Sequence, residues 1–449
     1  MVGFVVVSHS KELADAAIHL ANEMKRYNFP LINGSGTDGD FLGSNPLTIK
    51  EAILKAKTDK GVLIFVDIGS SVLNTQVAID FLADEGIDIE NIKKNLKKIK
   101  EINQNIICVL KDDAYGLGIE SILPVLINNG CLYFATAYIG EALKIKNIVK
   151  REFPDKMEKI SVMVLNYIEE NELKKAVKND IEITTFNFEQ LERYLDILKN
   201  EGRMKVHIKF NTGMNRLGFD ETETEKLMEK IKFASNIDIM SVYSHISDVG
   251  NEEETEKQIA KYDRIVSIFD SNSIKYRFRH IQASPLLFKY RKKYNYDFAR
   301  VGMAIYGMEP LNENIGLFPV LKLSSKIINI RKLSKEEKVS YGSRGKLKEN
   351  KTVAVIPVGY AHGLQKQIEN NGAYVLVNGK RAKILGEVCM DMIIVDITDI
   401  PEVKIGSEAV ITGKQGNEEI TLLQMAEWAG TIQDDILTKW NKGIKRILV

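Results

Sequence analysis

Cysteine is scarce in this sequence, and its few thiols are poorly placed for a disulfide or a metal site. Only Cys108, Cys131 and Cys389 occur in 449 residues, far apart and each inside an apolar or Met-rich stretch. Neither a disulfide framework nor the usual spacing of metal ligands fits this pattern. We therefore expect buried, reduced thiols and no bound metal.

The sequence also lacks an excess of charge and a long apolar run. Its 62 basic and 61 acidic residues leave a net charge of +1, which excludes the basic field that gathers nucleic acid or anionic lipid. The apolar run near the start, VGFVVV, is too short for a signal peptide or a membrane span, and no cationic region precedes it. We expect a cytoplasmic, multi-domain protein that acts on small molecules, with no nucleic-acid or membrane partner.

The sequence does contain three successive patterns, which together predict an α/β fold. Residues 1–86 alternate apolar runs such as GFVVV and VLIFV with amphipathic helices, which indicates a small open parallel α/β domain. Residues 87–315 hold eight apolar runs separated by helix-length segments, the pattern and size of a (β/α)8 TIM barrel. Residues 316–449 contain short alternating strands with NG and GKQG turns, then a helix, and predict a mostly β domain.

The residue that first suggests a function is Lys111, in the stretch VLKDDAYGLG. Barrels place their chemistry at the C-terminal ends of their strands, and Lys111 directly follows the first predicted barrel strand. A lone lysine there is usually a solvated surface residue. Other predicted strand ends, however, also carry polar groups or glycines, in IKFNTGMNRLGF, YSHIS, HIQASP and ARVGMAIYG. A barrel would bring all of these to the same mouth.

These stretches, followed by VSYGSRG, PVGYAHG and CMDMIIVD, occur in the order seen in bacterial alanine racemases, and the resemblance runs from about Ile87 to the C terminus. It implies a homodimer with shared active sites that uses pyridoxal 5′-phosphate to interconvert L- and D-alanine, supplying D-alanine for peptidoglycan. Lys111 would hold the cofactor as a Schiff base. Racemisation needs a base on each face of a planar carbanion, and Tyr341 of the partner subunit matches the second base opposite Lys111.

The resemblance also assigns residues to the cofactor. Arg300 would pair with the pyridine nitrogen, where an arginine that keeps its proton leaves the ring a weaker electron sink and disfavours transamination. His280 would orient this arginine, and His245 would lie beside the ring. A lone histidine near a strand end is more often structural, and we assign His207 and His19 to that class. The phosphate would be held by the hydroxyls of Tyr115, Ser284 and Tyr360 and by the backbone N–H groups of Gly302 and Met303.

On the substrate side, the resemblance implies that Arg216 binds the carboxylate, together with Met390 and Asp391 of the partner subunit. Lys209 matches a lysine that is often carbamylated in the family, which gives an anion beside the substrate arginine. Three positions depart from the usual pattern: Asn211 stands for aspartate, Asn215 for glycine and His362 for aspartate. None of these three is a cofactor contact.

The first 86 residues suggest a second function. His9 follows the first strand at a strand-to-helix turn, where backbone amides stabilise a phosphorylated imidazole. An isolated histidine there is more often a packed or capping residue. SHSKELA and VLIFVDIGSSVLNTQVAIDFL, however, resemble the mannose-type IIA phosphocarrier subunit of the phosphoenolpyruvate-dependent dihydroxyacetone kinase. This resemblance implies phosphorylation of His9 by phosphotransfer proteins, with Asp67 nearby, and it ends at residues 81–85, which predicts an incomplete sheet with an unpaired edge.

Three alternatives stay open on the sequence, about the reaction of the barrel and about the role of the first 86 residues. One is racemisation or decarboxylation of another amino acid on the same plan, although VSYGSRG and CMDM favour a racemase. The large side chains of Tyr341, Tyr360 and Met390 favour a small substrate. The others are a phosphocarrier acting through His9, and a racemase whose first 86 residues are only an appended folding or interaction module.

Overall fold

The computed structural model of the chain divides into two compact units, residues 1–86 and 87–448. It describes residues 2–37, 42–58, 61–67, 69–75, 86–199, 202–234, 236–291, 293–294, 296–311, 314–342, 346–440 and 443–448. Among the described helices, none is long and apolar enough to cross a membrane. The three cysteines are free; Cys108 and Cys131 are buried as expected, whereas Cys389 is only partly buried.

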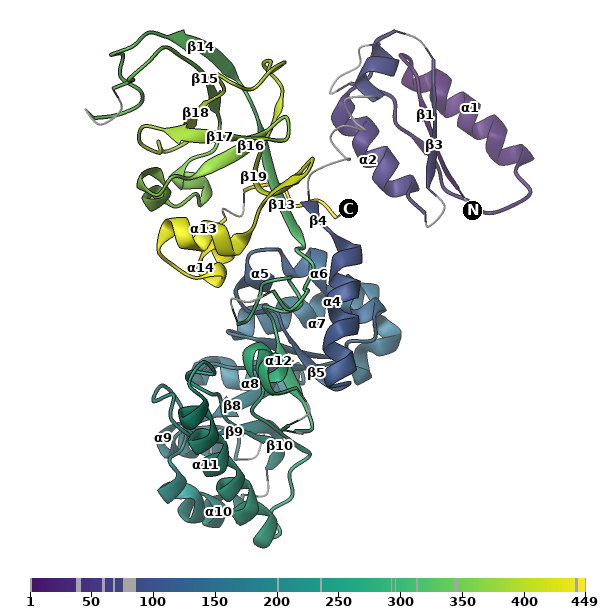
Figure 1. Cartoon of the computed structure of the whole chain (residues 1–449). Coiled ribbons are helices and arrows are strands. Elements are labelled where there is room, and N and C mark those ends of the chain that lie inside the picture. Colours follow the sequence, from purple (N-terminus) through teal and green to yellow (C-terminus); the bar gives the residue numbers. More distant parts are fainter. Residues whose placement is uncertain are drawn as a thin grey trace. The chain divides into compact units, whose positions relative to one another are not determined.

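The first unit is a small open sheet with helices on it, which confirms the expected parallel α/β domain. Strand β1 (Gly3–Val7) lies between β2 (Leu31–Asn33) and β3 (Val62–Val66), and both pairings are parallel. Helices α1 (Lys11–Met24) and α2 (Pro46–Ala56) lie on either side of β1 and β3 in Figure 1. The buried core lies between the sheet and α2, and consists of Val5, Val7, Ile49, Ala52, Ile53 and Ala56. The expected end of the phosphocarrier resemblance, at residues 81–85, falls outside the described residues.

The second unit begins with a closed parallel barrel. Its strands are β5 (Ile106–Val109), β6 (Tyr133–Thr136), β7 (Ser161–Val164), β8 (Glu182–Thr185), β9 (Met204–Lys209), β10 (Ile237–Tyr243), β11 (Phe278–His280) and β12 (Ala299–Val301). Each strand from β5 to β10 pairs with the next one in the chain, and β12 pairs with β5. The seam between β11 and β12 is closed by Arg300, whose N–H donates to the Gln282 carbonyl at 2.9 Å. The predicted TIM barrel is therefore confirmed.

Amphipathic helices cover the outside of the barrel, and the first of them illustrates why they form. In α4 (Ile89–Ile102), Asp88 caps the N terminus by accepting from the Asn91 N–H at 2.9 Å. Apolar residues at helical spacing, among them Leu96, are buried, while Lys93, Lys94 and Lys97 between them are exposed. The other helices of the barrel are α6 (Ile119–Asn128), α7 (Ile139–Glu152), α8 (Glu170–Lys178), α9 (Phe188–Ile197), α10 (Thr224–Lys232), α11 (Glu252–Ser271) and α12 (Ser284–Tyr290).

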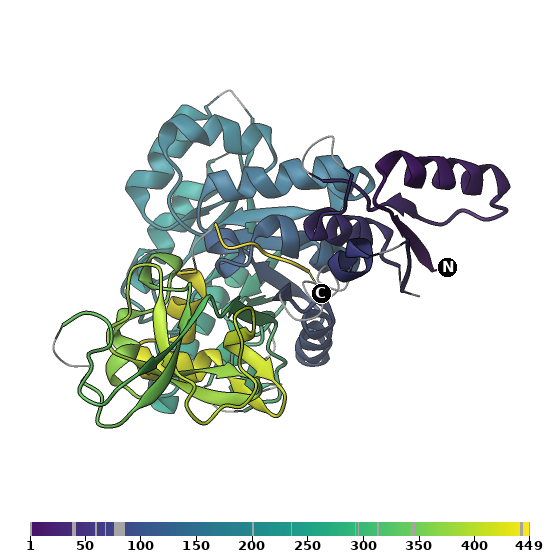
Figure 2. The same cartoon turned by 90° about the horizontal axis from the view of Figure 1, so that it is seen from above.

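The last part of the chain is mostly antiparallel β structure, as predicted, and Figure 2 shows these strands in green to yellow. The strands are β13 (Leu321–Lys326), β14 (Asn329–Leu333), β15 (Lys351–Ile356), β16 (Tyr374–Val377), β17 (Lys380–Leu385), β18 (Ile393–Asp396), β19 (Glu408–Gln415) and β20 (Glu418–Ile420), with the short β4 (Gly86–Ile87) beside β13. The predicted NG turn joins β16 to β17, with positive φ at Asn378 and Gly379. Helices α13 (Leu422–Ala429) and α14 (Gln433–Thr438) end the domain, and the Gln433 side chain donates to the Glu309 carbonyl at 3.1 Å.

Candidate functional site

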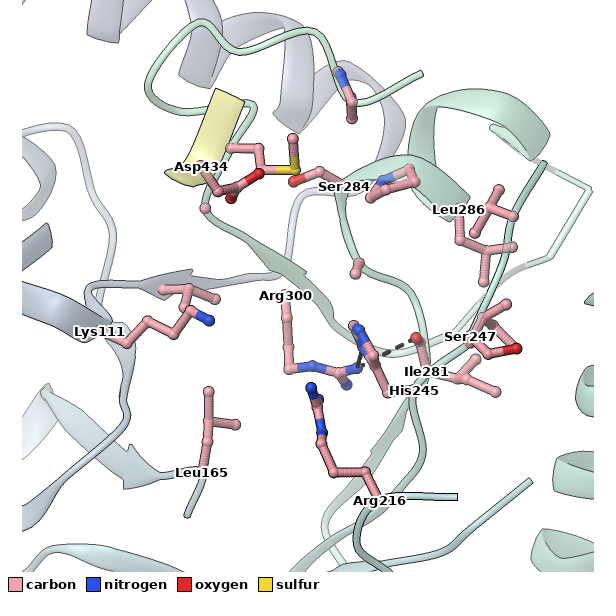
Figure 3. A pocket seen from close by; sticks show the side chains of 18 of the residues that line it. Lys111, Leu165, Arg216, His245, Ser247, Ile281, Ser284, Leu286, Arg300 and Asp434 are labelled. Carbon is pink, nitrogen blue, oxygen red and sulfur yellow. Dashed lines mark hydrogen bonds between the residues drawn. The ribbon is translucent and has the colours of Figure 1, made fainter. Parts of the chain in front are cut away.

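A cavity of about 840 Å³ opens at the C-terminal ends of the barrel strands (Figure 3). It gathers nine of the residues singled out from the sequence: Lys111, Tyr115, Lys209, Arg216, His245, Ser284, Arg300, Gly302 and Met303. In Figure 3, Lys111, in the turn after β5, and Arg300, on β12, extend into the cavity, and Arg216 approaches Arg300. Within the described ranges, no cluster of His, Cys, Asp and Glu could hold a metal ion. The charged side chains of its lining are four basic ones, Lys111, Lys209, Arg216 and Arg300, and three acidic ones, Asp112, Asp248 and Asp434.

An unusual turn positions Lys111 and Tyr115. Residues 112–115 all have φ between 55° and 57°, so this single turn of helix is left-handed. For L-residues this conformation costs about 1–2 kcal/mol each, and the surrounding structure has to enforce it. The Asp113 N–H donates to Glu141 at 2.9 Å, and Arg446 donates to the Gly116 carbonyl at 2.9 Å. Sequence analysis missed this turn.

Four hydrogen-bond donors in the cavity have no partner in the described chain. They are the hydroxyls of Tyr115 and Ser284 and the backbone N–H groups of Gly302 and Met303. A Cβ at Gly302 would lie 2.5 Å from the Tyr115 hydroxyl, so only glycine fits beside it. Burial raises the pKa of Tyr115 far above its usual range, which keeps this hydroxyl a donor. Such a set of unpaired donors fits a phosphate group.

Arg300 is buried at the centre of the site and is held by two histidines. Its Nη1 lies 2.5 Å from His280 Nδ1, and its Nη2 lies 3.1 Å from His245 Nδ1 and 2.8 Å from the Ser244 carbonyl. Burial lowers the pKa of Arg300 to about 10, so it is still a cation at neutral pH. Burial and the nearby Arg300 lower the pKa of His245 to about 3, so that imidazole is neutral. His280 does not line the cavity; it lies beneath Arg300, as an orienting residue should.

Lys209 is a buried lysine with an altered basicity. Burial, and then the charges of Arg300 and Arg216, lower the pKa of Lys209 to about 8. A sizeable fraction of its amine is therefore unprotonated near neutral pH and able to react with an electrophile such as carbon dioxide.

The loop that carries Arg216 accounts for two of the three departures from the family pattern. Asn215 has a φ of +53°, the left-handed region where glycine is favoured and asparagine is tolerated. The Asn211 side chain accepts from the Asn215 N–H at 2.9 Å and so stabilises this turn. The third departure, His362, accepts from the Gly359 N–H at 3.2 Å through Nδ1.

Four predicted site residues lie on the C-terminal domain and do not line this cavity. Tyr341, Met390 and Tyr360 are 67%, 54% and 43% exposed, and Asp391 lies beside Met390 on the same exposed loop. Their loops are tied together, because the Tyr360 N–H donates to the Cys389 carbonyl at 3.1 Å and the Ser340 hydroxyl to the Glu387 carbonyl at 2.6 Å. We call Tyr341, Tyr360 and Met390 the Tyr341 patch. Within one chain, Tyr360 is therefore not beside the four phosphate donors, contrary to the expectation from the sequence.

Sequence analysis also missed Asp434 on α14, whose carboxylate lines the cavity (Figure 3). Burial raises the pKa of Asp434, and Lys111 partly opposes this effect. No motif marks this carboxylate, because it comes from a short helix more than three hundred residues beyond Lys111.

In the first unit, His9 is the centre of a second polar cluster. Its Nδ1 lies 3.3 Å from Asp67 and 2.9 Å from the Ser71 hydroxyl, and its Nε2 lies 2.7 Å from the Ser70 hydroxyl. The predicted neighbours His9 and Asp67 are thus in contact. Helix α1 is capped by Ser10, which accepts from the Leu13 N–H, so capping does not account for His9.

Comparison with known proteins gives three family matches. Residues 87–310 match the family described as alanine racemase, N-terminal domain, and residues 320–448 match alanine racemase, C-terminal domain. Residues 3–94 match the family described as PTS system fructose IIA component, so this similarity extends past residues 81–85, where we expected it to end. Alanine racemase 1 of Clostridium acetobutylicum is 32% identical over 81% of this chain and 94% of its own length. Alanine racemase of Thermodesulfovibrio yellowstonii is 33% identical over 80% of this chain and 96% of its own.

Solved structures of racemases are also similar to this chain. The alanine racemase from Bacillus anthracis with bound L-Ala-P has a TM-score of 0.73 at 26% identity, covering 81% of this chain and 94% of that one. A histidine racemase from Leuconostoc mesenteroides has a TM-score of 0.72 at 22% identity over 81% of this chain and 96% of its own, which shows a common fold.

Proposed function

Because this chain belongs to the alanine racemase family, we propose that it is a pyridoxal-phosphate-dependent enzyme that interconverts L-alanine and D-alanine. Its role would be to supply D-alanine for peptidoglycan in the cytoplasm. The observation that carries the proposal is the presence of Lys111 and four unpaired phosphate donors in one cavity.

The residues of the cavity fit the cofactor at each end. When bound, pyridoxal phosphate supplies an electron-withdrawing ring that makes the Cα proton of an attached amino acid acidic. Lys111 would attach it covalently through Nζ. Tyr115, Ser284, Gly302 and Met303 would hold the phosphate, and the Arg300 guanidinium would donate to the ring nitrogen, with His245 beside the ring.

Racemisation requires proton transfer on both faces of the substrate. Of the two residues to which we assign these transfers, Lys111 and Tyr341, only Lys111 lines the cavity of its own chain. The Lys111 amine would take or give the proton on one face. The Tyr341 phenol would act on the other, contributed by a second copy of the chain, because it is 67% exposed and outside the cavity of its own chain. Met390 and Asp391 would arrive with it and face the substrate carboxylate that Arg216 binds. Tyr360 could reach the phosphate only from that second copy.

Lys209 has the properties that carbamylation needs. An unprotonated amine adds to carbon dioxide, and its lowered pKa makes that form available. We propose that the resulting anion pairs with Arg216, one of the two cations that act on Lys209, and orients it toward the substrate.

The proposal is tested by the visible spectrum of the purified full-length protein. We expect a cofactor absorption band that is lost in Lys111→Ala and kept in Lys93→Ala, an exposed lysine on α4 that serves as the control. A wild-type protein that binds no pyridoxal phosphate would refute the proposal.

Substrate choice needs its own assay. Racemisation should be measured with alanine, serine, lysine and histidine, because a histidine racemase shares this fold. We expect alanine to be turned over fastest. If lysine or histidine is turned over equally well or faster, the assignment to alanine is wrong, and carbon dioxide release would indicate a decarboxylase instead.

The His9 cluster favours a second candidate function, phosphate transfer. An imidazole that is 33% exposed, with Asp67 and two hydroxyls on its ring nitrogens, is both reachable and oriented. We expect label to pass from phosphoenolpyruvate, through the general phosphotransfer proteins, to the wild type and to His19→Ala, but not to His9→Ala. Absence of label on the wild type would leave residues 1–86 as an appended module.

A further inference from the structure

A chain of buried polar side chains crosses the barrel interior and ends at Arg300. It takes one residue from each of five successive strands, β8 to β12: Glu182, His207, Ser241, His280 and Arg300. Glu182 Oε2 lies 2.9 Å from His207 Nε2, and His207 Nδ1 lies 2.7 Å from Ser241 Oγ. Ser241 Oγ lies 2.9 Å from His280 Nε2, and His280 Nδ1 lies 2.5 Å from Arg300 Nη1. No member is more than 5% exposed.

With a single ring proton on each histidine, the two ends of this chain fix the direction of every hydrogen bond in it. Burial alone would raise the pKa of Glu182, but hydrogen bonds from His207 and Tyr133 lower it overall, so it is a carboxylate and only accepts. The Arg300 guanidinium only donates. One assignment satisfies both ends: Arg300 donates to His280, His280 to Ser241, Ser241 to His207, and His207 to Glu182. Both histidines are then neutral, with the proton on Nε2.

The ring of His280 has little other freedom. It stacks on Tyr243 with the ring centres 4.7 Å apart and the planes within 5°. Burial, then Arg300, lowers the pKa of His280 well below its usual range, which excludes a second ring proton. If the single proton were on Nδ1, it would point at the Arg300 N–H at 2.5 Å, donor against donor.

We propose that Glu182 is a positioning residue for the reaction at Arg300: through His207 it turns the Ser241 hydroxyl so that its oxygen accepts from His280 Nε2–H. This contact supports the tautomer whose Nδ1 lone pair holds the guanidinium. This inference rests on the proposed function for the role of Arg300, but the tautomers it assigns do not depend on activity. Tyr133 offers the alternative partner, since its hydroxyl lies 3.4 Å from His207 Nε2 and could donate to it. Removal of the Glu182 acceptor would therefore let His207 reverse.

The test is the ring-nitrogen NMR spectrum of full-length protein labelled with ¹⁵N-histidine, without added cofactor, alongside the racemisation rate of the cofactor-loaded protein. With only six histidines in the chain, His207 and His280 can be assigned by substitution. In the wild type, both should carry the proton on Nε2. In Glu182→Leu, the His207 proton should move to Nδ1, the His280 signals should shift, and kcat should fall by roughly tenfold, as expected when a hydrogen bond to a charged group is weakened.

Two further variants separate the hydrogen-bonded chain from other effects. Glu182→Gln keeps an acceptor for His207 and should retain the wild-type tautomers and most of the rate. Ser241→Ala cuts the chain, so adding Glu182→Leu to it should still change His207 but no longer change His280 or the rate. A wild-type His280 protonated on Nδ1, or a Glu182→Leu effect on His280 that persists in the Ser241→Ala background, overturns the proposal. If Glu182→Leu does not fold, the wild-type and Ser241→Ala spectra still decide the proposal. In Ser241→Ala, the ring-nitrogen signals of His280 should shift, whereas the His207 proton should stay on Nε2. Correct tautomers without racemisation would refute only the proposed function.

Discussion

Substituting Gly302 with alanine should damage the phosphate site by steric overlap alone. The φ of Gly302 lies outside the left-handed region, so the backbone accepts alanine without strain. The added Cβ would lie 2.5 Å from the Tyr115 hydroxyl oxygen and 2.9 Å from the ring carbon that carries it. Because heavy atoms pack best near 3.5 Å, the overlap with the oxygen is about 1 Å.

Tyr115 has little room to absorb this overlap. Its ring is buried, and its centre lies 5.1 Å from that of Tyr306. Overpacking of this kind typically costs about 1–3 kcal/mol. If the cost falls on the bound state, the Kd for pyridoxal phosphate should rise by roughly five- to 150-fold, since about 1.4 kcal/mol corresponds to a factor of ten.

The assay is a titration of cofactor-free protein, with thermal unfolding measured in parallel. Gly140→Ala is the matched control, because a Cβ there meets nothing within 4 Å and should leave the Kd unchanged. In a Tyr115→Phe background the closest contact is absent, so Gly302→Ala should cost less than in the wild type. If Gly302→Ala binds the cofactor as tightly as the wild type and is equally stable, the assignment of this corner to the phosphate is wrong.

Three other predictions test the remaining features. In buffer free of carbon dioxide, the difference in unfolding free energy between the wild type and Lys209→Gln should increase between about pH 8 and pH 10.5. In this pH range Lys209 binds more protons in the unfolded chain than in the folded one. A difference that does not change with pH would refute the lowered pKa. Mixing the inactive Lys111→Ala and Tyr341→Phe chains should restore about a quarter of wild-type activity if each site takes one residue from each copy, and no recovery means unshared sites. Leu96→Ala should destabilise the barrel by about 2–5 kcal/mol in chemical denaturation, whereas Lys97→Ala, on the exposed face of α4, should be close to neutral.

The barrel was predictable because its signal is local. Each of its eight strands begins within three residues of a mostly apolar run expected from the sequence, although β8 to β12 also carry buried polar side chains. The position of the cavity could be predicted from the barrel, because the C-terminal ends of its parallel strands lie at the same mouth. Lys111, His245 and Arg300 follow three of these strands or lie on them, and all three line the cavity.

What could not be predicted depends on the tertiary environment. The left-handed turn at residues 112–115 contains no glycine, and residues far away in sequence help to hold it. Glu141 accepts from the Asp113 N–H, and Arg446 donates to the carbonyl of Gly116 directly after the turn. Asp434 reaches the cavity from another domain. His207 was assigned a structural role because its partners Glu182 and Ser241 lie on neighbouring strands, at sequence distances that no motif records.

The position of the Tyr341 patch follows a similar logic on a larger scale. Large side chains that are 43–67% exposed on adjoining loops are costly for a monomer and typical of a contact surface. The cavity of one chain already holds Lys111 and the phosphate donors, whereas Tyr341 lies outside it. A two-fold axis would bring each patch to the cavity of the other copy, so that a single contact between copies would complete two sites at once. On this view, the exposure of Tyr341 in one chain is what a shared site requires.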